Sequence, residues 1–595
     1  MKKKEMFITL ILITMLILIG CQTPGNEGGR NGSIGVDNKF NSTSNGTADV
    51  VLRNGFIYTV DAESTTAEAM AVDGDVIIYI GDDKGVEVFI SEETRVIDLK
   101  GRMVMPGMYD AHAHPLWQYP DWIFGVDMTS AKSEGEYLAL LKDFVNENPE
   151  LTVIKGSGWD NPYFPQIGPR KELIDAIVPD KPVVLLNING HSSWVNSKAL
   201  ELLGIDSETE NPQGGYIIKD PETGEPTGLL KEEAMYLAEE LLPEYTDEQY
   251  RKALLSYQSD AHSFGLIGVN EAWLNDDYLS ALESAETDGV LKMRYAGEWW
   301  IEEKDDAIPD EINKAVEIAK RNKGGNFQLT GAKFFADGTV EEWTAWLSED
   351  YADGNNEFNR PQWDDLELFT RAVVDADKKG LRVHFHAIGD LGLKLAVDAI
   401  EQAVKVNPEW DRRSAITHLQ VVDDKEMDRM GSLDIVALPQ PVWFTKGDYF
   451  DNIEVPALGF ERASKEYPMK SLFDRGITVA SSTDTIAAFL DPLYGLQMAV
   501  TRVEPGYGLD PDNPEDVLGP EERISLEQAI ESYTINGAYS MYVDDITGSL
   551  ETGKKADYII LSDNLFNYEN HPEDIFENVS VVLTSFNGEI VYESE

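Results

Sequence analysis

Two histidines separated by one residue give the clearest chemical signal in the sequence. His112 and His114 end the run PGMYDAHAH, residues 106–114. Side chains alternate between the two faces of a β-strand, so Asp110, His112 and His114 point to one side if this run is a strand. Two imidazoles on one face can bind a single metal ion. The run therefore predicts a metal site at the end of a strand.

Three later runs end in the same kinds of side chain. His384 and His386 end one predicted strand, His418 ends the next, and Asp484 ends the last. The chain has eight histidines and one cysteine, so metal ligands must come from imidazoles, carboxylates or a lysine. A single histidine is more often a buried core residue, but four strand ends with such ligands in succession indicate one metal centre. We expect His384 to support a ligand and not to be one.

The elements that must position these residues form an alternating α/β pattern. Apolar strand-like runs alternate with amphipathic helical stretches, which predicts a TIM (β/α)8 barrel within residues 104–539. Active sites of such barrels lie at the carboxyl ends of the strands. The interval of about 120–260 is too long for one helix, so we expect an inserted α+β subdomain over the barrel mouth. The predicted barrel strands are 104–112, 266–271, 292–297, 329–336, 381–386, 414–418, 434–439 and 477–482.

Short alternating strands occupy both ends of the folded part. They lie in residues 49–103 and 540–595, which predicts one small composite β-sandwich domain built from both ends.

The first residues have the layout of an export signal. Residues 1–21 hold three lysines, a short apolar run and Leu-Ile-Gly-Cys, which resembles a bacterial lipobox ending at Cys21. The apolar run is shorter than the roughly 20 residues that a membrane-spanning helix needs. We therefore expect a lipoprotein signal peptide, lipidation of Cys21 and a flexible tether over 22–48. The protein would be lipid-anchored at the cell membrane, facing away from the cytoplasm.

The charge limits the partners. The formal net charge is −58, with an isoelectric point near 4.3, which excludes nucleic acid as a ligand and disfavours polyanionic substrates. A hydrated acidic surface accounts for most of this charge. No pattern indicates an oligomeric state.

From residue 49 to the end, the chain resembles the metal-dependent amidohydrolase superfamily, specifically amidohydrolase family 3, which includes proteins like N-substituted formamide deformylase. The resemblance implies that His112, His114, His386 and His418 are metal ligands and that Asp484 is both a ligand and the catalytic base. Ser482-Thr483-Asp484 departs from the usual Gly-Ser-Asp of this branch, which puts the loop path in doubt. Further matching motifs are Gly-Trp-Asp at 158–160, GHSSWVNSKAL at 190–200 and KFFADG at 333–338.

Lys333 has two interpretations. In related enzymes, a lysine on the fourth strand is carboxylated and bridges two divalent ions, and an unpaired lysine is otherwise disfavoured inside a barrel. The alternative is an ion pair with Asp337.

Four motif residues are candidate substrate-binding residues: Trp159, His191, Trp194 and Asp337. His191 would reach the active site from the insertion. The alternative is that His191 and Trp194 only join the insertion to the barrel.

These observations favour a hydrolase that cleaves a C–N bond, with an N-formyl or N-acyl amide as the first choice of small-molecule substrate. We expect two divalent ions, most simply zinc. Two alternatives stay open: a mononuclear deaminase of a heterocycle, and a non-catalytic solute-binding lipoprotein.

Overall fold

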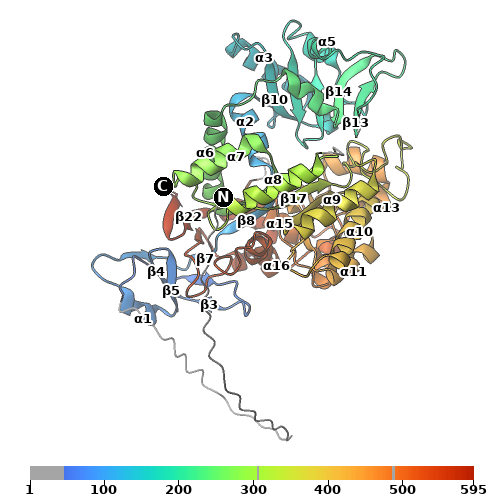
Figure 1. The fold of residues 1–595 in the computed structure, drawn as a ribbon. Coiled ribbons are helices and arrows are strands. Elements are labelled where there is room, and N and C mark those ends of the chain that lie inside the picture. Colours follow the sequence, from blue (N-terminus) through green and yellow to red (C-terminus); the bar gives the residue numbers. More distant parts are fainter. Residues whose placement is uncertain (1–45, 213, 304–306, 485–489, 595) are drawn as a thin grey trace, which may run out of the picture. The chain divides into compact units, whose positions relative to one another are not determined.

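The computed structural model describes residues 46–212, 214–303, 307–484 and 490–594 (Figure 1). The predicted signal peptide 1–21, the lipidation site Cys21 and nearly all of the tether 22–48 lie outside these residues. Within the described part of the chain, no helix combines the length and apolar character needed to cross a membrane.

A parallel sheet of seven strands forms the centre of the largest domain. Its order is β20-β19-β18-β17-β16-β15-β8, and every neighbouring pair is parallel. The strands are β8 (Met108–Ala113), β15 (Leu266–Leu274), β16 (Arg294–Trp300), β17 (Phe327–Phe335), β18 (Arg382–Ala387), β19 (Ala415–His418) and β20 (Val436–Leu438).

An eighth extended segment closes this sheet into a barrel. Val479 bridges Ala437 of β20 in parallel, and on the other side Ala111 of β8 donates to the carbonyl of Ser481 over 3.2 Å. Asp484 then donates its backbone N–H to the carbonyl of His112 over 2.9 Å. The structure confirms the predicted TIM barrel, and this closure brings Asp484 beside the end of β8.

Amphipathic helices cover the barrel. In α8 (Ile308–Arg321), the buried residues Ile308, Ile312, Ala315 and Ile318 recur at a spacing of three or four and so form one face. The other main helices between or after the strands are α6 (Asp247–Ser263), α7 (Asp276–Thr287), α9 (Leu366–Lys378), α10 (Asp390–Val406), α11 (Asp424–Ser432), α15 (Pro492–Thr501) and α16 (Leu526–Tyr533).

Strands from both ends of the chain build a β-sandwich. One sheet has the order β5-β4-β1-β6 and the other β23-β22-β21-β7-β2-β3, so N-terminal and C-terminal strands (blue and red in Figure 1) share a sheet. The pairing of β21 with β7 makes this connection. The strands are β1 (Val50–Arg53), β2 (Phe56–Tyr58), β3 (Thr66–Ala67), β4 (Ala69–Asp73), β5 (Val76–Gly81), β6 (Arg95–Asp98), β7 (Met103–Pro106), β21 (Tyr558–Leu561), β22 (Val581–Phe586) and β23 (Glu589–Glu593).

The predicted first barrel strand, 104–112, is wrong at its start. Residues 103–106 form β7 of the sandwich, and the barrel strand begins at Met108. Gly107 separates the two, and a Cβ atom there would lie within 2.6 Å of the Ile267 side chain. Sequence periodicity does not show the break because both strands are buried and apolar.

The insertion forms an α+β subdomain. Its sheet has the order β13-β14-β12-β11-β10-β9 and covers residues 126–232, while α6 already belongs to the barrel. The elements are β9 (Val126–Asp127), α3 (Glu134–Glu147), β10 (Ile154–Trp159), α4 (Lys171–Asp175), β11 (Val183–Asn187), β12 (Ser192–Val195), α5 (Ser197–Leu203), β13 (Gly215–Lys219) and β14 (Pro226–Glu232).

Candidate metal centre and cavity

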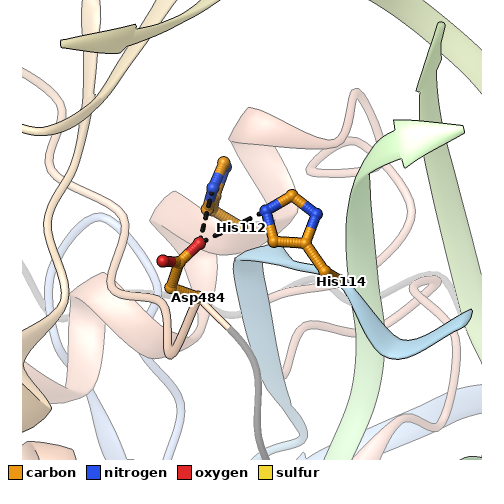
Figure 2. A group of neighbouring side chains, drawn as sticks. All are labelled: His112, His114 and Asp484. Carbon is orange, nitrogen blue, oxygen red and sulfur yellow. Dashed lines mark ion pairs between the residues drawn. The ribbon is translucent and has the colours of Figure 1, made fainter. Parts of the chain in front are cut away.

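His112, His114 and Asp484 form the centre of the site. Figure 2 shows both imidazoles directed at the same carboxylate oxygen. Asp484 Oδ1 lies 2.9 Å from His112 Nε2 and 3.3 Å from His114 Nε2, and the three ligand atoms are within 4.8 Å of one another. Burial opposes ionisation of Asp484, but the neighbouring imidazoles outweigh it and hold the pKa of this carboxyl well below its ordinary value. The carboxylate is therefore anionic.

His386 and His418 lie beside this group. Their ring centroids are 4.4 Å apart, and the His418 ring is 5.3 Å from that of His112. His386 Nε2 is 3.1 Å from the carbonyl oxygen of Gly338, so Nε2 carries the proton and Nδ1 keeps its lone pair. Burial lowers the pKa of His418 to about 3 and that of His386 well below its ordinary value. Both rings are neutral, as metal ligation requires.

Gln440 fixes the tautomer of His418. Its amide nitrogen donates to the hydroxyls of Thr417 and Ser482 over 2.9 and 2.8 Å, which leaves Oε1 as an acceptor. This oxygen is 3.0 Å from His418 Nδ1. Nδ1 therefore donates to Gln440, and Nε2 of His418 presents its lone pair.

His112 is held by a buried chain of polar side chains. Its Nδ1 atom lies 3.0 Å from His384 Nε2. His384 Nδ1 donates to Glu298, whose other oxygen is 3.0 Å from the Arg382 guanidinium. His384 Nε2 is thereby the acceptor and His112 Nδ1 the donor, so Nε2 of His112 is the ring nitrogen left for a metal ion. All four side chains are at most 1% exposed. His384 thus contacts the candidate ligand His112 on the side of the ring away from Asp484, as expected for a residue that supports a ligand.

Lys333 lies inside the barrel without a carboxylate partner among the described residues. Its Nζ atom is fully buried and 3.5 Å from His112 Nε2. Burial lowers the pKa of this amine to about 7.

Asp337 does not form the ion pair considered from the sequence. Its carboxylate accepts the backbone N–H groups of Trp346, Ile388 and Gly389 over 2.8 to 3.0 Å. It therefore fixes the loops after β17 and β18 and does not pair with Lys333. It is not part of the cavity wall, and its contact with substrate stays a prediction.

The donor set fits a divalent metal. Two imidazole nitrogens and a carboxylate oxygen converge, and two further neutral imidazoles adjoin them with lone pairs set by their own hydrogen bonds. Nitrogen and oxygen donors of this kind suit zinc or a similar ion. The amine of Lys333 fits beside such an ion only when it is neutral or carboxylated, because an ammonium would repel the cation.

Thr483 explains the departure in the last motif. Its backbone N–H donates to Asp110 over 3.0 Å, and its hydroxyl donates to the other oxygen of the same carboxylate over 2.5 Å. Asp110 also accepts the N–H of His112 over 3.3 Å. The threonine therefore ties the loop that carries Asp484 to the strand that carries the two histidines.

A cavity of about 740 Å³ opens onto the centre, and its wall includes His114, His386, His418 and Asp484. His191 reaches it from the insertion, with its ring 5.1 Å from that of His386. Burial disfavours the imidazolium, but Glu232, 2.9 Å from Nδ1, outweighs it and raises the pKa of His191 to about 9. His191 therefore presents a positive charge to the cavity, and its contact with substrate stays a prediction.

Trp159 and Trp194 are not in the cavity wall. Both are fully buried in the core of the insertion, where their ring centroids are 6.3 Å apart and both pack on Phe164. Trp159 Nε1 donates to the carbonyl of Leu185 over 2.8 Å. The two side chains, which belong to different motifs, serve the packing of the subdomain, and their contact with substrate stays a prediction.

Two buried glutamates were missed from the sequence. Glu298 holds His384, and Glu271 of β15 lies 3.6 Å from His114 Nδ1 while accepting the Tyr295 hydroxyl over 3.0 Å. Each stands fully buried in a mostly apolar barrel strand. That position was the available signal, because an acidic residue is rarely fully buried without a partner.

Comparisons with known proteins agree with this site. The protein-family sequence model described as "Amidohydrolase family" matches residues 95–592. The crystal structure of an uncharacterized metal-dependent hydrolase from Pyrococcus horikoshii superposes on this chain with a TM-score of 0.68 and 27% sequence identity. The superposition covers 88% of this chain and 99% of that one. Fold and site thus define a metal-dependent hydrolase that acts on C–N bonds. The chain belongs to the amidohydrolase family.

Three named proteins are similar to this chain in sequence. The protein Long After Far-Red 3 of Arabidopsis thaliana is 31% identical over 92% of each chain. Putative amidohydrolase YtcJ of Bacillus subtilis is 30% identical over 91% of this chain and 99% of its own. N-substituted formamide deformylase of Arthrobacter pascens is 24% identical over 86% of this chain and 93% of its own. The alternative of a non-catalytic solute-binding protein finds no support among them.

Proposed function

We propose that this enzyme hydrolyses an N-formyl or N-acyl amide with two divalent metal ions, most simply zinc. The observation that carries the proposal is the convergence of His112, His114 and Asp484 within 4.8 Å at a cavity large enough for a small organic substrate. The similarity to a formamide deformylase supports the choice of amide.

The hydrogen bonds of His112, His386 and His418 support their proposed roles as ligands. His112 and His114 would hold one ion, and His386 and His418 the other. When bound, such ions act as Lewis acids and make a water molecule acidic enough to serve as the nucleophile near neutral pH. Lys333 lies beside His112 and could help to hold both ions as a carbamate, formed when its neutral amine adds carbon dioxide and releases a proton.

Asp484 would transfer protons, and His191 would stabilise negative charge. Asp484 is anionic and stands at the centre, so it can accept the proton of the attacking water and pass it to the leaving nitrogen. His191 is protonated and faces the same cavity, so it can donate a hydrogen bond to the carbonyl oxygen as negative charge develops there. Glu232 keeps the His191 ring oriented.

The test combines metal analysis with a substrate screen. The full chain, purified without chelator, is analysed for metals and assayed against N-formyl and N-acyl amines. About two ions per chain with release of the amine would support the proposal. About one ion with release of ammonia from a ring amidine would favour the mononuclear deaminase, and failure to bind any metal would overturn the catalytic assignment.

We also propose that the protein is anchored outside the cytoplasm by a lipid on Cys21. The export-type residues before this cysteine support the proposal. Mass spectrometry of the N-terminal peptide from membranes should show a diacylglyceryl adduct that the Cys21→Ala variant lacks. An unmodified N-terminus at Met1 would contradict it.

A further inference from the structure

One part of the cavity wall combines buried carboxyl groups with aromatic rings. Glu341 and Glu454 line it together with Trp443, Tyr449 and Tyr467, and we call these five residues the acidic lobe. Glu341 is 9% exposed and Glu454 4% exposed. Carboxylates at such depth are unfavourable unless a positive charge or several hydrogen bonds compensate them.

The protein supplies little compensation. Among the described residues, neither Glu341 nor Glu454 forms an ion pair. Glu341 accepts hydrogen bonds from the amide of Asn189 and from its own backbone. Glu454 accepts from the amide of Gln420 and forms a hydrogen bond with the carboxyl group of Glu466. The two cationic side chains of the cavity wall are engaged or peripheral: His191 pairs with Glu232, and Lys132 is exposed.

Glu466 adds to the negative character behind the lobe. It is 1% exposed, and Gln420 Nε2 donates to it over 2.5 Å and to Glu454 over 3.2 Å. The carboxyl groups of Glu466 and Glu454 also form a hydrogen bond with each other, which requires one of the two to be protonated. The nearby guanidinium of Arg502 donates to the backbone carbonyl of Glu466 and not to its carboxyl group. One neutral amide therefore serves two carboxyl groups.

A hydroxyl group beside Glu341 also lacks a partner. Thr339 is 5% exposed and lines the cavity two residues before Glu341, and its Oγ1 atom makes no hydrogen bond to any described residue. A buried polar atom in a cavity wall without a partner is a position where a ligand can complete the hydrogen bonding. It points to a ligand independently of the carboxyl groups.

The acidic lobe adjoins the metal centre. The Trp443 ring stacks on His418 with centroids 5.6 Å apart, and the Tyr467 ring lies 6.3 Å beyond Trp443. Aromatic faces next to carboxylates are the usual recognition elements for ammonium groups. A substrate whose amide lies at His418 can thus extend a second functional group into the lobe.

We propose that the natural substrate is an amide that carries a positively charged group, an ammonium or guanidinium, and that the acidic lobe binds this group. The inference rests on the proposed function, since it names the substrate class for the same site. The buried carboxyl groups would become fully ionised when the cation is bound. Without such a ligand, burial first and the neighbouring Glu341 second raise the pKa of Glu454 to about 8.

Binding is tested first, because it does not depend on turnover. Choline and its neutral isostere 3,3-dimethyl-1-butanol differ in charge, and a quaternary ammonium cannot ligate zinc. Calorimetric titration of the zinc-loaded full chain should show choline binding at least about ten-fold more tightly. The Glu341→Gln and Glu454→Gln variants should each lose most of this preference. Glu147→Gln, an exposed change outside the cavity wall, should keep it.

Equal binding of the two probes, tighter binding of the alcohol, or no binding of either would overturn the inference. So would a choline preference that both cavity variants retain in full. The first three outcomes are also expected if the carboxyl groups serve only to balance the metal charge. Circular dichroism checks that each variant is folded. If one of the two cavity variants fails to fold, the other still tests the inference.

A substrate pair separates this inference from the proposed function. Mono-N-formyl-1,5-diaminopentane and N-formylhexylamine have similar length, but only the first has an ammonium group. The cationic amide should show a kcat/KM at least about ten-fold higher. A choline preference without hydrolysis of either amide would reject the proposed function and leave the acidic lobe as a cation site. Hydrolysis of the neutral amide without a choline preference would support the proposed function and reject the acidic lobe as a cation site.

Discussion

The Nδ1 atom of His112 lies 3.0 Å from the Nε2 atom of His384, so one buried imidazole orients another. Glu298 and Arg382 continue this chain away from the centre. The chain determines which nitrogen of His112 faces Asp484. Side chains that orient metal ligands in this way commonly affect metal affinity by 10- to 100-fold.

We therefore predict that His384→Ala weakens zinc binding by about 10- to 100-fold while the fold is retained. Competition with a chromogenic chelator measures the affinity. His571→Ala is the matched control, because His571 is exposed and its imidazole lies beside Glu573. An affinity for zinc equal to that of the wild type would show that His384 only fills space.

The sequence was sufficient for the barrel and for the histidine positions. The alternation of side chains predicted that His112 and His114 share a face, and the strand order predicted that Asp484 returns beside them, as it does over 2.9 Å. Both predictions depend on backbone geometry, which periodicity reveals.

Sequence reasoning failed where the function of a side chain depends on its tertiary neighbours. Trp159 and Trp194 belong to matching motifs, but their distance from the centre depends on how the insertion packs. Asp337 follows Lys333 by four residues, yet its carboxylate turns to backbone N–H groups of its own loop and of the loop after β18. Glu298 was missed because its partners His384 and Arg382 lie more than 80 residues further along the chain.

Asp484→Asn should remove the base and leave the ligand nitrogens in place. We predict a fall in kcat of about 10²- to 10⁴-fold with nearly unchanged metal content. Steady-state assays on a substrate from the amide screen and elemental analysis give the two values. Asp545→Asn, at an exposed position, controls for the loss of one charge. Near-normal turnover by Asp484→Asn would remove Asp484 from the role of base.

Trp159→Ala should act on stability and not on substrate binding. The side chain is fully buried and donates a hydrogen bond to Leu185, so its removal should cost about 3 to 5 kcal/mol. Trp443→Ala provides the contrast, because Trp443 lines the cavity and should mainly raise KM. Thermal melting and KM, measured well below the melting temperature, distinguish the two. A raised KM with normal stability in Trp159→Ala would instead support a role for Trp159 in substrate binding.

The stability of the free protein should depend on pH through Glu454. Burial, then repulsion from Glu341, raises the pKa of Glu454 from an ordinary 4.5 to about 8. Between these values the unfolded chain loses the proton and the folded chain keeps it, so the free energy of unfolding falls as pH rises. The contribution is fully present below about pH 4.5 and lost above about pH 8.

Glu454→Gln cannot titrate, so the free energy of unfolding of the wild type relative to this variant should decrease by about 1 kcal/mol per pH unit between those limits. Urea unfolding at several pH values, with Glu147→Gln as control, measures this slope, and parallel curves for wild type and Glu454→Gln would show that Glu454 is already ionised in the folded protein.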